Sequence, residues 1–471
     1  MAPDGDTAST LRDLEPAMAR VWEIARRLGL EPYPVHFELV PATIMYEFGA
    51  YGLPGRFSHW THGRGYQKLK TMYDHGLSKI YEMVVNANPA HAFLVENNSV
   101  LQNTVVAAHV LGHVDFFANN SYFVGTNRQM IEGATVNAER IRRHEYRHGQ
   151  REVEEFLDAV LSIQEHVDPA AGRLRQEPHE ARRHQQPRER PYDDLFYLGS
   201  EKRPVVEEPR RNALAEPATD LLLFISEHAA DLEDWQRDII DIVRAEQLYF
   251  RPQMQTKIMN EGWASLWHAR IMREMDLASA DYMEFSQMHA SVLATSRRHL
   301  NPYTLGMRVF EDIERRWDAP SPEERDRGRQ PGEGRGKIFE VRALESDASF
   351  LRNYLTADLV EALDLYLYRL EGDTWVIVEK DWAKVRDAVV HSMTNHGQPV
   401  IVVEDGDFND RGELFLRHCF EGDELDLPYV EGTLRYLFTL WGKPVHLATR
   451  SEDKPIIVSC DGRTTSTTPA T

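Results

Sequence analysis

Two histidines four residues apart are the part of the chain whose type and spacing could do chemistry. His109 and His113 stand in an otherwise apolar run that begins at Val105. On a helix they would lie about 40° apart on one face, at about 100° per residue. Buried imidazoles need polar partners, and a divalent cation, zinc in particular, is one that a helical pair at this spacing can bind. Core histidines satisfied by ordinary hydrogen bonds show the same pattern, so both interpretations are open at this point.

A third ligand would have to come from a later helix. Glu261 and His268 are seven residues apart in a segment rich in tryptophan, so they share a helical face and both can point toward the histidine pair. An exposed helical glutamate is the alternative, but a glycine and two tryptophans in this segment are typical of a packed helix. We therefore predict His109, His113, Glu261 and His268 as metal ligands.

The residue beside the first histidine departs from the usual metallopeptidase pattern. Gly112 resembles the glycine of the HExGH motif in thimet-oligopeptidase-like enzymes, where it leaves room for a crossing helix. In HExxH enzymes a glutamate after the first histidine activates the bound water, but Val110 stands there in this chain. Another carboxylate takes that role, or the site catalyses a different reaction, or it is structural. The candidate carboxylates are Glu47, Glu96, Glu132 and Glu246.

His62 is a further candidate, as a ligand or a proton donor. It lies in a stretch dense in glycine, aromatic residues and histidine, residues 37–67, which is typical of an ordered loop. Such loops line binding sites or cover a core. The alternative is a loop histidine bonded to a backbone carbonyl group.

Apolar periodicity predicts that helices position these residues. Ser99 and Gln102 form a capping-box pattern that opens a helix running to about Ala118. The other helices are predicted at residues 14–30, 221–247, 253–274 and 281–299, with a last one ending near Trp317. Pro252 is expected to separate the helices on its two sides, because proline cannot continue a helix interior. These elements predict a large, mainly helical domain with zincin-like helices over residues 1–320.

A second, smaller domain is predicted at residues 336–462. A linker rich in Pro, Glu, Arg and Gly precedes it at residues 320–336. Alternating apolar residues predict strands at 338–341, 366–370, 375–378, 400–403 and 455–458, with helices at 382–396 and 429–441. The expected fold class is therefore α+β. Residues 168–218 are polar enough to predict a flexible insertion, and residues 463–471 a disordered tail.

Composition narrows the function classes. The formal net charge is −21, which argues against nucleic acid as a partner, because phosphate binding needs a basic face. Two cysteines, Cys419 and Cys460, indicate no disulfide framework and fit a reducing interior. Residues 1–15 contain no apolar signal region, and no apolar run is long enough to span a membrane. We therefore expect a cytoplasmic protein that does not insert into a membrane.

Seven segments carry a resemblance to a known family. They are residues 37–46, 49–60, 84–89, 96–98, 109–120, 254–264 and 301–306. Over these segments the chain resembles the stage V sporulation protein R (SpoVR) family. That resemblance implies a link to sporulation and the spore cortex, or to the stress response in bacteria that form no spores. It also implies possible partners, a PrkA-type serine protein kinase and a protein with a von Willebrand-like domain.

Two functions follow from these observations. The first is a metal-dependent, hydrolase-like protein that acts on amide bonds of cell-wall or peptide material. The second is a non-catalytic regulator or scaffold that works with the kinase. Val110, at the position of the usual base, leaves open whether the chain is an enzyme.

Overall fold

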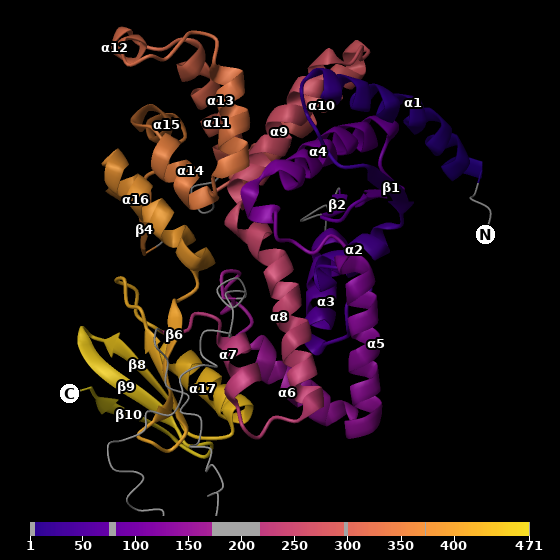
Figure 1. Ribbon diagram of the computed structural model, residues 1–471. Helices are drawn as coiled ribbons and strands as arrows, with labels where there is room; N and C mark the ends of the chain where they lie inside the picture. The colour runs from indigo at the N-terminus through magenta and orange to yellow at the C-terminus, as the bar shows by residue number, and fades with distance from the viewer. Residues whose placement is uncertain (1–4, 75–81, 172–216, 296–299, 373, 471) are drawn as a thin grey trace, which may run out of the picture. The chain divides into compact units, whose positions relative to one another are not determined.

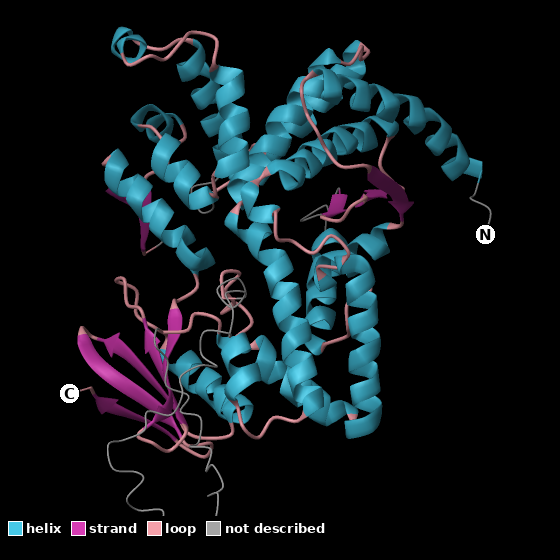
Figure 2. Cartoon of the chain, viewed as in Figure 1, coloured by secondary structure: helices cyan, strands magenta, loops and turns pink. Residues whose placement is uncertain are grey.

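The computed structural model describes residues 5–74, 82–171, 217–295, 300–372 and 374–470 (Figure 1). The chain forms two compact units. The first consists of Met1–Arg143 and Tyr249–Gly397, and the second of His144–Leu248 and Gln398–Thr471. Helices dominate the first unit, and the second combines helices with a five-stranded sheet (Figure 2). The predicted α+β class is confirmed at this level.

Local sequence signals begin the helices of the first unit. Helix α4, Val100–Asn119, starts at the predicted capping box, in which Ser99 and Gln102 each accept a backbone hydrogen bond from the other. Helix α11, Pro302–Asp318, starts at Asn301, whose side chain accepts two backbone hydrogen bonds. The other α-helices described in this unit are α1 (Gly5–Arg27), α2 (Ala42–Tyr51), α3 (Trp60–Asp74), α9 (Lys257–Glu274), α10 (Ser279–Val292), α12 (Pro322–Asp326), α13 (Gly334–Leu344), α14 (Asp347–Tyr354), α15 (Ala357–Ala362) and α16 (Trp382–Met393).

A three-stranded sheet covers one side of α4. Strand β3 (Ala90–Val95) is central, parallel to β1 (Val35–Val40) and antiparallel to β2 (Glu82–Val85). Alternate residues of β3 pack against α4 in a buried apolar cluster. That cluster contains Ala90, Ala92 and Leu94 from the strand and Val106, Val110 and Val114 from the helix. The sheet therefore fixes one face of α4 and leaves the rest of the helix for other partners.

Glycines allow α9 to pass very close to two neighbouring helices. A Cβ atom on Gly112 of α4 would lie 2.7 Å from Cα of Ala264 on α9. On the other side of α9, a Cβ on Gly262 would overlap the backbone of Gly306 on α11. The prediction that Gly112 makes room for a crossing helix is confirmed. The two contacts hold α9 between α4 and α11, along a core that includes Trp263.

Four predictions for this unit were wrong. Most of residues 37–67, predicted as an ordered loop, lie in β1, α2 and α3. Residues 338–341 belong to helix α13, because Ile338 and Val341 also satisfy the helical period and both pack into the core that α11 shares. The predicted linker contains helix α12, which a capping box at Ser321 opens. Pro252 lies inside α8 (Asp234–Gln255), and the break before α9 falls at Thr256 instead. One missing N–H group did not end the helix. The unit also contains the antiparallel pair β4 (Leu367–Glu371) and β5 (Thr374–Glu379).

The second unit is built around a mixed sheet of order β10-β9-β8-β7-β6. Its strands are β6 (Ile401–Phe408), β7 (Glu413–His418), β8 (Val445–Ser451), β9 (Lys454–Cys460) and β10 (Thr465–Pro469). Helix α17 (Leu427–Trp441) packs against β8, β9 and helix α6 (Gln150–Leu161). Helix α7 (Leu221–His228) also belongs to this unit, and α5 (Met130–His148) and α8 each contribute residues to both units.

The C-terminal tail is ordered through residue 470, so the prediction of disorder there was wrong. Asp461 accepts hydrogen bonds from the backbone N–H groups of Arg463 and Thr464, which turns the chain back. The next residues then pair with β9 as strand β10. Threonine-rich sequence suits an edge strand, and pairing with a neighbour supplied the order that composition did not show.

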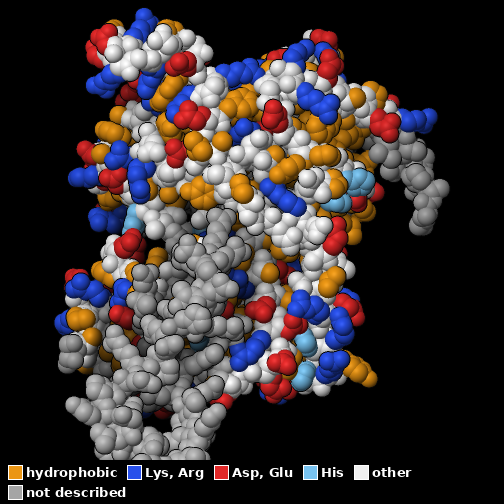
Figure 3. Space-filling model, in the orientation of Figure 1, with side chains coloured by type: hydrophobic (Ala, Val, Ile, Leu, Met, Phe, Trp, Pro, Cys, Tyr) orange, Lys and Arg blue, Asp and Glu red, His pale blue; other side chains and the backbone are white. Residues whose placement is uncertain are grey.

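Two other predictions concern a flexible insertion and a domain boundary. Most of the predicted insertion, residues 172–216, lies outside the described residues. The predicted boundary at residues 320–336 does not coincide with any of the points where the chain passes between the units, which follow Arg143, Leu248 and Gly397. Among the described residues, no helix is long and apolar enough to cross a membrane. On the face shown in Figure 3, acidic side chains are interspersed with basic ones.

Candidate metal centre

Helix α4 carries the predicted histidine pair in the middle of its buried length. His109 and His113 are both buried, and their ring centroids are 4.6 Å apart at an interplanar angle of 83°. The helical spacing of four residues turns both rings to the same side, away from the cluster under the sheet. There they meet Glu261, which α9 carries two residues before Trp263.

The three side chains converge on one point. Oε2 of Glu261 lies 3.6 Å from Nε2 of His109 and 3.5 Å from Nε2 of His113. All three ligand atoms lie within 4.8 Å of one another. Ligands about 2.0–2.2 Å from a tetrahedral ion stand roughly 3.3–3.6 Å apart, so the two distances to Glu261 suit a zinc-sized cation. Oε2 is buried and has no hydrogen-bond partner among the described residues, so these residues fit a cation.

The Nδ1 atom of each imidazole lies within hydrogen-bond distance of a side chain on α9. Nδ1 of His113 lies 2.9 Å from Oδ1 of Asn260, the residue before Glu261 on α9. Nδ1 of His109 lies 2.8 Å from Nδ1 of His268, two turns further along the same helix. Ligating histidines are usually oriented by such a partner on the non-ligating nitrogen. The arrangement leaves both Nε2 atoms directed at the glutamate.

Burial sets the protonation states that a cation needs. Burial lowers the pKa of His113 to about 4, and the adjacent His109 ring adds to this shift. Burial works against ionisation of Glu261, but the two imidazoles outweigh it, so the pKa of this carboxyl lies below its usual value. At neutral pH the site therefore offers a neutral imidazole at His113 and a carboxylate at Glu261. Metal ligands must be deprotonated in this way.

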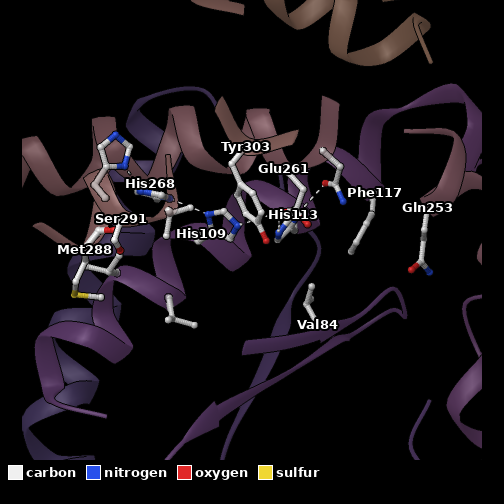
Figure 4. A pocket seen from close by; sticks show the side chains of 15 residues that line it. Val84, His109, His113, Phe117, Gln253, Glu261, His268, Met288, Ser291 and Tyr303 are labelled. Carbon is white, nitrogen blue, oxygen red and sulfur yellow. Dashed lines mark hydrogen bonds and ion pairs between the residues drawn. The ribbon is translucent and has the colours of Figure 1, made fainter. Parts of the chain in front are cut away.

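The centre forms part of the wall of a cavity of about 650 Å³ (Figure 4). The polar lining includes Gln253, Asn260, Ser291 and Tyr303, and the apolar lining Val84, Val105, Val106, Phe117, Met288 and Val292. Figure 4 shows the hydroxyl end of Tyr303 directed at the histidine pair, and the rings of Tyr303 and His109 are stacked 6.1 Å apart. Among the described lining residues, Glu261 is the one carboxylate.

Comparison with known proteins identifies the family. The profile described as SpoVR like protein matches residues 8–398, and that of the SpoVR-like C-terminal domain matches residues 399–452. The chain belongs to the SpoVR family. The resemblance predicted from the sequence is confirmed, and the first SpoVR profile includes every residue of the candidate metal centre. The C-terminal SpoVR profile begins next to Gln398, where the second unit resumes.

A curated relative supports the same assignment. The chain is 31% identical over 333 residues to the uncharacterized protein YcgB of Escherichia coli (strain K12). The match covers 66% of this SpoVR family chain and 65% of YcgB, so it spans less than two thirds of that relative. No solved structure matches the chain.

The structure brings together three of the four predicted ligands and sets the fourth apart. Glu261 faces the histidine pair, whereas His268 contacts Nδ1 of His109 on the side away from the centre. Seven residues span about 10.5 Å along a helix, so Glu261 and His268 cannot both reach one ion. A shared helical face was therefore not enough to make both residues ligands.

The predicted candidate bases do not line the cavity. Glu47 on α2, Glu96 after β3 and Glu132 in the first turn of α5 are exposed. Glu246 is buried, but it lies on the part of α8 that belongs to the second unit. A base must come within hydrogen-bond reach of the proton it removes, and none of these four carboxylates is among the described lining residues.

His62 is a buried residue of α3 and not a part of the centre. Its Nδ1 lies 3.2 Å from the carbonyl oxygen of Phe57, and its ring packs against Tyr51. Burial lowers the pKa of His62 to about 4, and the guanidinium of Arg56 adds to this shift. The contact matches the alternative given above, a histidine bonded to a backbone carbonyl group.

Two residues of the site were not predicted, although the sequence contained a signal for each of them. Asn260 directly precedes the predicted ligand Glu261, and Tyr303 follows the Asn301-Pro302 turn, within one of the segments on which the resemblance was based. His289 of α10 also lines the cavity, and nothing in its sequence surroundings indicated this.

Proposed function

We propose that this SpoVR family member is a metal-dependent, hydrolase-like protein that acts on amide bonds of soluble peptide or cell-wall precursor material. Its cation, zinc by preference, would be held by His109, His113 and Glu261 in a zincin-like arrangement of two helices. The observation that carries this proposal is Oε2 of Glu261, which is buried between two imidazole nitrogens without a hydrogen-bond partner among the described residues. The family name supports a role connected with sporulation.

Each side chain has a part in that chemistry. A bound divalent cation would supply Lewis-acid activation of a carbonyl group or a water molecule. Asn260 holds the ring of His113 in its ligating orientation. Tyr303 points its hydroxyl end at the centre, where it can donate a hydrogen bond to an oxygen that gains negative charge. The apolar walls, for example Val106 and Phe117, would exclude water from the acyl part of a substrate.

Metal analysis of the purified full-length protein tests the first half of this proposal. We expect one equivalent of zinc, or of another divalent transition metal, in the wild type, and a loss of it in His113→Ala and Glu261→Gln. His62→Ala is the matched control, since His62 is also a buried histidine of the first unit but does not line the cavity. A wild-type protein without stoichiometric metal, or a His113→Ala variant that keeps it, would contradict the proposal.

Amine release tests the second half. The metal-loaded protein should release new amino groups from a panel of N-acyl peptides and soluble muropeptides. Glu261→Gln and chelator-treated wild type should release none. Metal binding without any amine release would retain the metal centre and remove the hydrolase assignment.

One observation favours a second function, a non-catalytic regulator that works with a PrkA-type kinase. Val110 occupies the place of the usual base and is fully buried against the sheet. In that case the metal would stabilise the fold only. Affinity purification from starved cells separates the two functions. Recovery of the kinase with wild type and with Glu261→Gln alike would favour regulation, and failure to recover it would favour chemistry.

A further inference from the structure

Behind the metal centre, three histidines form a continuous chain of close nitrogen contacts. Nδ1 of His109 lies 2.8 Å from Nδ1 of His268, and Nε2 of His268 lies 2.8 Å from Nδ1 of His289. His268 is buried and His289 is partly exposed, and both rings line the cavity. Phe285 of α10 packs against both rings, with centroid distances of 6.3 Å to His268 and 5.8 Å to His289. The three histidines therefore connect a candidate ligand, His109, to His289 at a second point on the cavity wall.

The chemistry of imidazole determines which nitrogen donates and which accepts in each of these contacts. A neutral imidazole has one donor nitrogen and one acceptor nitrogen. If His109 binds a cation through Nε2, its proton stays on Nδ1, and Nδ1 of His268 must accept it. His268 then carries its proton on Nε2 and donates to Nδ1 of His289. His289 in turn holds its proton on Nε2, which has no hydrogen-bond partner among the described residues.

We propose that His268 is the positioning residue of the metal centre. By accepting the proton on Nδ1 of His109 it keeps Nε2 of that ring free to bind the cation, and it sets His289 as a hydrogen-bond donor toward a ligand oxygen in the cavity. This inference rests on the proposed function, because it assumes a cation at His109 and Glu261. Partners of this kind typically change metal affinity about 10- to 100-fold when they are removed.

Two isosteric substitutions of His268 separate its two contacts. In His268→Asn the amide oxygen takes the place of Nδ1 and can still accept from His109. In His268→Gln the amide nitrogen takes the place of Nε2 and can still donate to His289, but the acceptor for His109 is lost. Zinc affinity is measured on the full-length protein by competition with a chromophoric chelator, with His268→Leu as the complete deletion and His62→Leu as a buried-histidine control.

We expect His268→Leu and His268→Gln to bind zinc about 10- to 100-fold more weakly than the wild type. His268→Asn and His62→Leu should stay close to the wild type. A general effect on folding would weaken the Asn and Gln variants alike, so their separation is the readout that a merely structural role would not produce. Equal affinities for wild type, Gln and Leu would overturn the inference while leaving the metal site in place. A wild type that binds no zinc would overturn the proposed function and the inference together.

The tautomers give an independent readout. In zinc-loaded protein labelled with ¹⁵N-histidine, two-bond proton–nitrogen correlations should show His268 and His289 protonated on Nε2. A His268 ring protonated on Nδ1 would overturn the direction of the chain, because that proton would compete with the one on Nδ1 of His109.

Discussion

Replacing Gly112 with alanine tests whether the spacing of two helices sets the geometry of the proposed metal centre. The new Cβ would lie 2.7 Å from Cα and 3.2 Å from Cβ of Ala264, whereas ordinary contacts of this kind are 3.4–4 Å. Backbone atoms cannot rotate out of the way, so α9 would have to move away from α4 by about 1 Å. Glu261 lies on α9 three residues before Ala264 and would move with it.

That movement is large on the scale of metal coordination. The distances from Oε2 of Glu261 to the two Nε2 atoms would rise from 3.5 and 3.6 Å to about 4.5 Å, whereas ligand distances tolerate only about 0.2 Å. We expect zinc affinity to fall at least about tenfold, the size of effect seen when a residue that orients a metal ligand is removed. The free energy of unfolding should fall by about 0–2 kcal/mol, because overpacking costs about 1–3 kcal/mol and alanine returns about 1 kcal/mol of helix propensity.

The assay combines metal content with urea unfolding of the same preparations. Gly133→Ala is the matched control, since it also places alanine in a helix, α5, but its Cβ would have no neighbour within 4 Å. This control should keep its metal and gain up to about 1 kcal/mol. The reasoning would be refuted by a Gly112→Ala protein with wild-type zinc affinity, or by equal metal loss in both variants.

Two further predictions concern the supports of α4 and α9. Arg342→Ala should cost about 3–5 kcal/mol of unfolding free energy in urea titrations, because it leaves the fully buried Asp115 of α4 without its ion-pair partner; a cost under 1 kcal/mol would count against this. Burial raises the pKa of Asp347, whose carboxylate accepts the N–H groups of Ile258 and Met259, from 3.8 to about 7. Since the folded-state pKa is the higher one, the stability should fall as pH rises from about 4 to 7, by at most about 1.4 kcal/mol per unit. Asp347→Asn should lack this component, and identical pH slopes for the two proteins would disprove it.

The parts that could be predicted from the sequence depend on neighbours along the chain. The apolar run around His109 and His113 fixed the helix, its burial and the common side of the two rings. Ser99 fixed its start, because a capping hydroxyl acts within three residues. Gly112 predicted a close crossing, since a glycine inside a buried helix is otherwise a cost. Such signals act over a few residues, and one sequence is enough to interpret them.

The parts that could not be predicted depend on partners far along the chain. Glu261 and His268 share a helical face, and only the position at which α9 crosses α4 decides which of them meets the histidine pair. The segment around Ile338 satisfies both the strand and the helix period, so its packing in the core that α11 shares decided the outcome. The edge strand at Thr465–Pro469 exists because β9 lies beside it. Strand preference depends on the neighbours that a segment pairs with, so contacts of this kind decide its structure.

The packing of Val110 explains why the centre differs in kind from an HExxH site. Its side chain is fully buried with Ala90 and Leu94, on the face of α4 that the sheet covers. A carboxylate at this position would lie in an apolar cluster without a polar partner, where burying its charge would cost free energy. The missing base is therefore part of how α4 packs, and exchanging one residue would not restore it. Proton transfer at the proposed centre would then use groups that face the cavity, and among the described lining residues Tyr303 points its hydroxyl end at the histidine pair.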